Sequence, residues 1–259
     1  MGKFSAFPFL SNTIITFQMK YLFFFIAVAT AMGQVKFEPE HTEVWEPKPA
    51  KITPVINAEP PSDAIVLFDG TDLSLWEGEE GTPASWTLND DRSITVKPKS
   101  GGIQTKAEFG SIQLHIEWKS PEIVKGDGQG RGNSGIYFQK VYEVQVLDSY
   151  ESVTYSNGQA SSVYKQHIPM VNATLPPGKW QTYDIVFNEP KYEANGKRIK
   201  KGTLTVFHNG VLVQNNVEIK GTSEYRGFPK LRDINIPKKI YLQDHGDLVS
   251  YRNIWLRKL

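Results

Sequence analysis

Short segments in which apolar and polar residues alternate recur along this chain. In residues 112–118, Ile112, Leu114, Ile116 and Trp118 are separated by polar or charged residues. A period of two is typical of a β-strand with one buried face, so these four side chains are predicted to face the core. Further short strands are predicted at residues 64–68, 85–88, 93–97, 135–139, 142–147, 182–188, 203–208, 211–213, 239–243 and 249–257.

Turn residues separate these segments. Asn89-Asp90-Asp91 lies between residues 85–88 and 93–97, and Asn209-Gly210 lies between residues 203–208 and 211–213. Asn-Gly between two strand segments is the strongest short hairpin signal. No segment has a helical period of useful length. The pattern predicts one all-β domain over residues 63–259, an antiparallel β-sandwich or jelly roll of about a dozen strands.

The N-terminal region has the composition of a targeting sequence. From Met19 a short charged start is followed by the apolar run 22–31 and by small residues at Ala31 and Gly33. This pattern predicts a signal peptide region at residues 1–33 with the start at Met19, and a run too short for a membrane span. The mature protein is then expected to begin near Gln34 and to be exported to the periplasm or beyond.

Residues 34–62 are polar and rich in proline, with prolines at positions 39, 47, 49, 54, 60 and 61. Proline fixes φ and removes a hydrogen-bond donor, so this segment is predicted to be an extended linker or a strap lying along the domain.

Composition excludes several functions. The chain has 29 Lys and Arg against 28 Asp and Glu, a net charge of +1, which gives no electrostatic reason to expect nucleic acid as a partner. It has no Cys, which excludes disulfides, thiolate metal sites and a Cys nucleophile. The Gly-x-Ser-x-Gly elbow of serine hydrolases is absent, and the glycine-rich loop 126–135 lacks the Walker lysine.

Candidate site residues lie in three stretches. Arg131 and Asn133 enter a predicted strand from the glycine-rich loop, where polar groups can be aimed into a cleft. In residues 142–147, alternation places Glu143 and Gln145 on the face opposite the valines, which is either an ordinary solvated surface or a groove. As an exposed groove carboxylate, Glu143 would contribute little to folding. Gln243 and His245 also share one parity.

Five motifs follow one another along the chain. They are Leu67-Phe68-Asp69-Gly70-Thr71-Asp72-Leu73-Ser74-Leu75-Trp76, Asn133-Ser134-Gly135-Ile136-Tyr137, Tyr142-Glu143-Val144-Gln145-Val146-Leu147-Asp148, Leu242-Gln243-Asp244-His245-Gly246 and Tyr251-Arg252-Asn253-Ile254. In this order they resemble the 3-keto-disaccharide hydrolase family, from about residue 64 to residue 259. The resemblance implies the concanavalin A-like jelly roll. The long loop before Asn133 and the basic excursion 191–201 depart from the family pattern and could change the size of the substrate.

The resemblance also implies a chemistry. A ketone at C3 of a sugar acidifies the hydrogen on C2; a base removes it, the enolate expels the group at C1, and water adds to the product. Glu143 or His245 could be the base, and Arg131 and Arg252 could stabilise the enolate. The substrate-binding candidates are Asn133, Tyr137, Gln145, Asp148, Gln243 and Arg252.

Two points stay open in the sequence. A divalent metal could bind the ketone and enolate oxygens, but no set of ligands is evident from spacing. A non-catalytic, lectin-like carbohydrate-binding domain is the alternative function, because sandwiches of this architecture serve both purposes. The mixture of ionisable residues in motif positions favours the enzyme.

Overall fold

The computed structural model of this protein describes residues 37–259. They belong to two compact units, one ending at Lys51 and the other running from Ile52 to Leu259. The first unit contributes one described element, the short 3-10 helix η1 (Pro39–Thr42). The predicted signal peptide region 1–33, with its start at Met19, lies outside the described residues. No helix in the described part has the length and apolar character required to cross a membrane.

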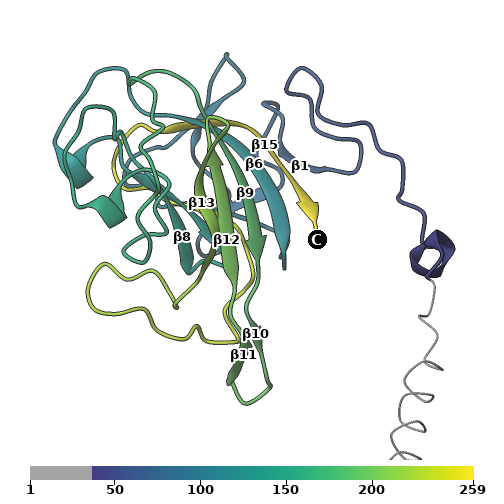
Figure 1. Cartoon of the computed structure of the whole chain (residues 1–259). Coiled ribbons are helices and arrows are strands. Elements are labelled where there is room, and N and C mark those ends of the chain that lie inside the picture. The colour runs from purple at the N-terminus through teal and green to yellow at the C-terminus, as the bar shows by residue number, and fades with distance from the viewer. Residues whose placement is uncertain (1–36) are drawn as a thin grey trace, which may run out of the picture. The chain divides into compact units, whose positions relative to one another are not determined.

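The second unit is built on two antiparallel sheets (Figure 1). The larger has the order β13-β12-β9-β6-β15-β4-β3, with β1 also paired to β15. Its strands are β1 (Ile65–Phe68), β3 (Thr87–Leu88), β4 (Ile94–Thr95), β6 (Ile112–Lys119), β9 (Gln181–Asn188), β12 (Thr203–His208), β13 (Val211–Glu218) and β15 (Ser250–Lys258).

The smaller sheet has the order β2-β5-β14-β7-β8. Its strands are β2 (Trp76–Gly78), β5 (Ile103–Thr105), β14 (Tyr241–Leu242), β7 (Ser134–Phe138) and β8 (Tyr142–Val146). Two 3-10 helices lie in its connecting loops, η2 (Gly128–Gly130) and η3 (Ser156–Gly158). The basic excursion forms a two-stranded hairpin, β10 (Lys191–Tyr192) and β11 (Arg198–Lys200), which projects from the sandwich in Figure 1.

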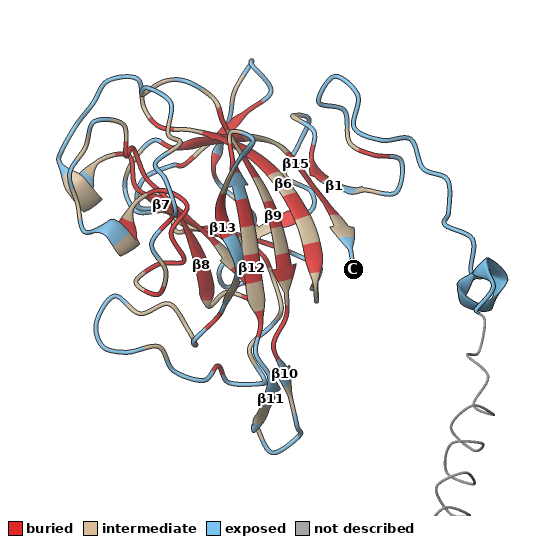
Figure 2. Cartoon of the chain, viewed as in Figure 1, coloured by how far each residue is buried: buried red, intermediate tan, exposed pale blue. Residues whose placement is uncertain are grey.

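The core lies between the two sheets, and its side chains alternate as predicted. Ile112, Leu114, Ile116 and Trp118 are all buried in it, whereas His115 is only partly buried on the other face of β6. Figure 2 shows the resulting alternation of buried and less buried positions along the strands of the larger sheet. The all-β antiparallel sandwich predicted from the sequence is therefore confirmed.

The predicted hairpin at Asn209-Gly210 is also confirmed. His208 pairs with Val211, and both turn residues have positive φ, 51° and 77°. This is the backbone that two-residue hairpins favour and that Asn-Gly adopts readily. The described residues form fifteen strands in all, more than the predicted dozen, because two- and three-residue pairings such as β10 with β11 are too short for a visible period.

Two tyrosines of the larger sheet donate hydrogen bonds across the core. Tyr183 on β9 donates to the backbone carbonyl of Gln145 at 2.9 Å, and Tyr251 on β15 donates to the Ser134 hydroxyl at 2.6 Å. Ser134 in turn donates to the carbonyl of Gln243 at 2.6 Å. Buried hydroxyls with satisfied hydrogen bonds hold their partners in one arrangement. The strands of the smaller sheet are thereby fixed to the larger sheet.

The boundary between the two compact units falls within the predicted linker or strap, residues 34–62. Residues 52–62 belong to the same compact unit as the sandwich. The side-chain amide of Asn253 on β15 donates to the Ala58 carbonyl at 3.1 Å. Just after this segment, Asp63 accepts hydrogen bonds from the Arg257 guanidinium at 2.7–2.9 Å.

Because Leu114 is fully buried on the central strand β6, Leu114→Ala should lower the free energy of unfolding by about 2–5 kcal/mol. The matched control is Leu88→Ala on the edge strand β3, where the side chain is exposed and the loss should be below about 1 kcal/mol. Urea denaturation of both variants measures the difference. Equal losses would contradict the placement of β6 in the core.

Candidate functional site

A polar cavity of about 260 Å³ opens on the outer face of the smaller sheet. We call it the site cavity. Ile136, Val144 and Leu242 on the strands beneath it are buried in the core, so their alternate neighbours point outward into the cavity. The cavity is lined by Gln129, Asn133, Tyr137, Glu143, Gln145, Tyr155, Tyr164, Ser223, Tyr225, Gln243 and His245.

Strand pairing brings the predicted residues together. Tyr137 on β7 lies opposite Glu143 on β8, and Gly135 lies opposite Gln145. On the other side of β7, the backbone of Gln243 donates to the Gly135 carbonyl at 3.0 Å. Of the nine residues proposed from the sequence, the structure places six in this one cavity: Asn133, Tyr137, Glu143, Gln145, Gln243 and His245.

Gly135 provides the space that the Glu143 carboxylate occupies. A Cβ atom at position 135 would lie 2.7 Å from Oε1 of Glu143 and 2.8 Å from the ring of Tyr137. Real Cβ contacts are essentially never this short, so only glycine allows both side chains to lie over the strand.

Glu143 is buried, which corrects the expectation of an exposed groove carboxylate. Its exposed fraction is 4%. Residues 161–164 run along the edge of β8, where the Glu143 carbonyl accepts from the backbone of Tyr164 and the Gln145 carbonyl accepts from that of Ser161. This burial raises the pKa of Glu143 to about 8, a rise that neighbouring Tyr137 opposes only in part.

Amide side chains beside the carboxylate have free acceptor atoms. Gln145 donates to Asn133 Oδ1 at 2.9 Å, and Gln243 donates to the Tyr137 hydroxyl at 3.3 Å. Within residues 37–259, the Oε1 atoms of both glutamines are buried and accept no hydrogen bond. Buried polar atoms are normally paired, so a ligand with several hydroxyl groups can complete them once the two amide groups turn towards the cavity.

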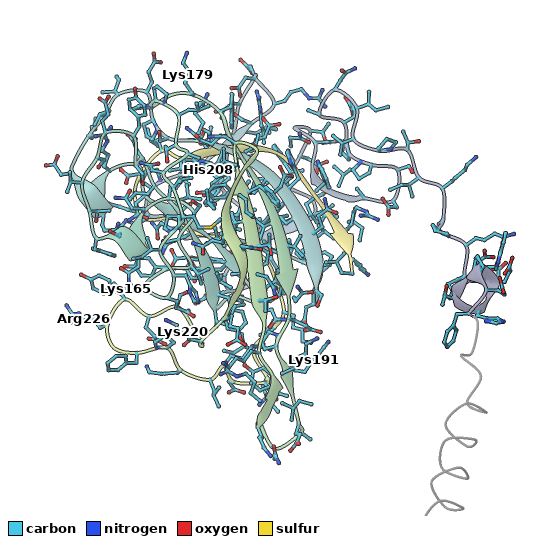
Figure 3. The ribbon with its side chains drawn as sticks, viewed as in Figure 1. Lys165, Lys179, Lys191, His208, Lys220 and Arg226 are labelled. Carbon is cyan, nitrogen blue, oxygen red and sulfur yellow. The ribbon has the colours of Figure 1, made fainter. Side chains whose placement is uncertain are left out.

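Three tyrosines that sequence reasoning missed form one wall of the cavity. Tyr155 and Tyr164 are joined by a hydroxyl–hydroxyl hydrogen bond of 2.7 Å, and Tyr225 completes the wall. Lys165, labelled with Arg226 in Figure 3, lies 4.8 Å from the ring centroid of Tyr225 and 5.4 Å from that of Tyr155. Flat rings of this kind suit the face of a sugar. Gln129 and Ser223, also missed, lie like these tyrosines in loops or a short 3-10 helix, where no strand period marks their orientation.

Arg131 and Asp148 do not lie in the site cavity, although Arg131 was predicted to stabilise the enolate and Asp148 to bind the substrate. Arg131 Nε donates to Asp148 Oδ2 at 2.7 Å, and its guanidinium also donates to the Tyr150 carbonyl. Both residues line a second, adjoining cavity. Their charges satisfy each other, so Arg131 reaches neither Glu143 nor the tyrosine wall as an oxyanion donor would.

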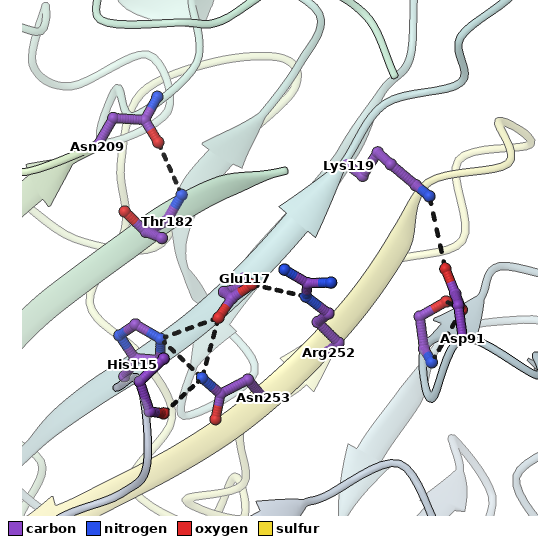
Figure 4. A network of polar contacts seen from close by, with 10 residues as sticks. Asp91, His115, Glu117, Lys119, Thr182, Asn209, Arg252 and Asn253 are labelled. Carbon is purple, nitrogen blue, oxygen red and sulfur yellow. Dashed lines mark hydrogen bonds and ion pairs between the residues drawn. The ribbon is translucent and has the colours of Figure 1, made fainter. Parts of the chain in front are cut away.

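Arg252 lies on the opposite face of the sandwich. Tyr251 before it is buried in the core, so Arg252 points outward from the larger sheet, where its guanidinium donates to Glu117 at 2.7 Å. Figure 4 shows this network, in which Asn253 also donates to Glu117 and His115 lies near it. Arg252 therefore cannot contact a substrate bound over Glu143.

The cavity offers few metal ligands. Glu143 and His245 are its only carboxylate and imidazole, and residues 37–259 contain no group of three or more His, Asp or Glu side chains placed to hold a metal ion. Binding sites for divalent ions typically need at least three such ligands. The donor set fits a hydroxylated organic ligand instead. The hairpin β10–β11 contributes no residue to the cavity, so the excursion 191–201 does not shape it.

Comparison with known proteins adds to this geometry. The family model of the 3-keto-alpha-glucoside-1,2-lyase-like domain matches residues 63–257. A 3-keto-disaccharide hydrolase of Bacteroides thetaiotaomicron is 25% identical over 248 residues, covering 75% of this chain and 78% of the relative.

Solved structures with this fold are similar as well. A "putative glycosyl hydrolase" of Parabacteroides distasonis is 46% identical, with a TM-score of 0.83 over 88% of this chain and 99% of that chain. A second protein of the same description and organism is 20% identical, with a TM-score of 0.56 over 76% of this chain and 94% of that chain, and shares the fold.

The burial of Glu143 predicts an unusual pH dependence of stability. Between about pH 4.5 and pH 8 the folded protein keeps a proton that the unfolded chain releases, so the free energy of unfolding falls as pH rises. Glu143→Gln removes this loss. The variant should gain about 2–4 kcal/mol relative to the wild type on going from pH 5 to pH 8.

Glu189 is the matched control with the opposite sign. It too is buried, but Lys191 and Lys238 bind it at 2.5 and 2.7 Å and, against the effect of burial, hold its pKa below the ordinary value. Glu189→Gln should therefore destabilise the protein more at pH 7 than at pH 3. Chemical denaturation across pH measures both. A Glu143→Gln variant with the wild-type pH dependence would show that Glu143 is not held protonated.

Proposed function

Because this chain belongs to the 3-keto-alpha-glucoside-1,2-lyase-like family and is similar to a 3-keto-disaccharide hydrolase, we propose that it cleaves 3-keto-glycosides through an elimination followed by hydration. The carbohydrate is bound in the site cavity, with C2 of the oxidised ring over Glu143. The observation that carries this proposal is the buried carboxyl group of Glu143, the only one that lines this polar cavity. Beside it, the amide oxygens of Gln145 and Gln243 have no hydrogen-bond partner.

In the first step Glu143 takes the proton from C2. The electron pair of the C2–H bond passes to the C3 carbonyl, giving an enolate, and then forms the C1–C2 double bond as the C1–O bond breaks. A carboxylate with its pKa near 8 is a stronger base than an ordinary one, and its pKa lies close to the working pH, where general bases are most effective. Burial thus raises the pKa of Glu143 into the range that suits a general base.

In the second step water adds to C1, and the protonated Glu143 returns its proton to C2. His245, exposed at the cavity wall, gives a proton to the departing oxygen and then takes one from the water. The hydroxyl of the Tyr155–Tyr164 pair that keeps a free proton takes the place of arginines as the donor to the enolate oxygen. Gln145 and Gln243 accept hydrogen bonds from the sugar hydroxyls.

We also propose that the protein is exported, with a mature chain that starts near Gln34. The support is the charged, apolar and small-residue pattern from Met19 to Gly33. Mass spectrometry of the protein purified from its native envelope should find Gln34 as the first residue. An intact segment 1–33 would refute the proposal.

Glu143→Gln keeps the shape of the side chain but removes the base, so turnover of a 3-keto-glucoside should fall by about two orders of magnitude or more. In the wild type, the rising limb of the kcat/KM profile should be centred near pH 8, where Glu143 loses its proton. His245→Ala distinguishes the two candidate bases. The rise of kcat/KM with pH persists in this variant if Glu143 is the base, and it disappears if His245 is the base. Binding without turnover in the wild type would instead favour the lectin-like alternative.

Gly135→Ala tests whether the position of the Glu143 carboxylate matters for activity. The added methyl group displaces Glu143 and the Tyr137 ring, so kcat should fall at least tenfold while the fold is retained. Gly130→Ala, in the loop that leads to the same strand, is the control, because a Cβ there meets nothing within 4 Å. Equal activity in the two variants would show that the position of Glu143 does not matter.

A further inference from the structure

A larger cavity, of about 600 Å³, adjoins the site cavity. We call it the adjoining cavity. Its lining includes Ile123, Val124, Arg131, Asp148, Gly246 and Leu248. It exceeds the site cavity in volume, and none of its lining residues has a role in the proposed reaction.

Two chain segments separate the cavities and contribute to both. Gln129 and Asn133 line the site cavity, whereas Arg131 between them lines the adjoining one. In the second segment His245 lines the site cavity and Gly246 the adjoining one. The two segments are joined by a hydrogen bond of 2.8 Å from the Asn133 backbone to Asp247 Oδ2. Both cavities therefore border the same two segments of the chain.

The adjoining cavity has apolar walls. Ile123 and Leu248 expose 75% and 53% of their surface, and Val124 is also exposed beside Pro98 and Pro121. Large apolar side chains gathered around a concavity are typical of sites that bind apolar groups. At its wall the partly buried Arg131 and the buried Asp148 already pair with each other. Glu122 and Lys125, which also line the cavity, are exposed charged residues, so its apolar side chains are what distinguish it from the site cavity.

We infer that the adjoining cavity holds the leaving group of the substrate, and that this group is an apolar aglycone. This inference rests on the proposed function, since it places the C1 oxygen at His245, between the two cavities. The sugar ring lies in the polar cavity and the alcohol that departs lies among Ile123, Val124 and Leu248. The arrangement separates the two halves of the substrate by polarity.

The test compares methyl and octyl 3-keto-α-glucosides, whose leaving alcohols have similar acidity. The octyl substrate should have a kcat/KM at least tenfold higher, mainly through a lower KM, because its chain leaves water. The double variant Ile123→Ser, Leu248→Ser should reduce this ratio to about 1 while the methyl substrate reacts as before. Ile168→Ser, Leu175→Ser, which changes exposed apolar residues outside both cavities, should leave the ratio unchanged.

Binding separates failure of this inference from failure of the proposed function. Calorimetry with unoxidised octyl α-glucoside, below its micelle concentration, should show tighter binding to Glu143→Gln than methyl α-glucoside does. The additional substitutions Ile123→Ser and Leu248→Ser should abolish the difference. If neither oxidised substrate reacts but this binding pattern holds, the reaction is wrong and the apolar subsite stands. Equal affinity for both glucosides, or a preference for a 3-keto-disaccharide over the octyl substrate, would overturn the inference.

Discussion

The site depends on the strand register of the smaller sheet, and hydrogen bonds through the core fix that register. Val144 and Val146 fill the interior, and the Tyr183 hydroxyl binds the carbonyl of Gln145 between them. The Tyr251 hydroxyl fixes Ser134 on the neighbouring strand in the same way. A one-residue shift of β8 would turn Glu143 into the core. The polar contacts inside the sandwich thus determine which side chains face the cavity outside it.

Two glutamates show how differently this fold treats one side chain. Glu117 is surrounded by donors, and despite its burial the nearby His115 and the hydrogen bonds from Asn253 and Arg252 lower its pKa to about 2. Glu143 is buried without a cation, and its pKa rises to about 8. The first is a permanently charged structural anion, and the second is a group able to accept and return a proton near neutral pH. Neither pKa shift can be predicted from the number of charged residues nearby in the sequence.

Alternation in the sequence was sufficient to predict the sandwich, the Asn209-Gly210 turn and the outward face that carries Glu143, Gln145 and Gln243. It failed where the chain leaves regular strands. Arg131 lies in a glycine-rich loop, and its pairing with Asp148 is a tertiary contact. The tyrosine wall comes from irregular segments, where Ser161 and Lys165 adopt positive φ and no period reveals which way a side chain points. The burial of Glu143 follows from these segments, so it too was beyond the pattern.

The position of β15 in the larger sheet has a consequence for how the protein is made. This strand lies between β6 and β4 and also pairs with β1, yet it is the last strand of the chain. The first strand of the sandwich, β1, and the central strand β6 are joined only through β15, so they stay unconnected until residues 250–258 have been synthesised. Pairings so distant in sequence form slowly. A chain still emerging from the ribosome can pair β6, β9, β12 and β13, but it cannot yet join them to β1, β3 and β4, so its larger sheet stays open.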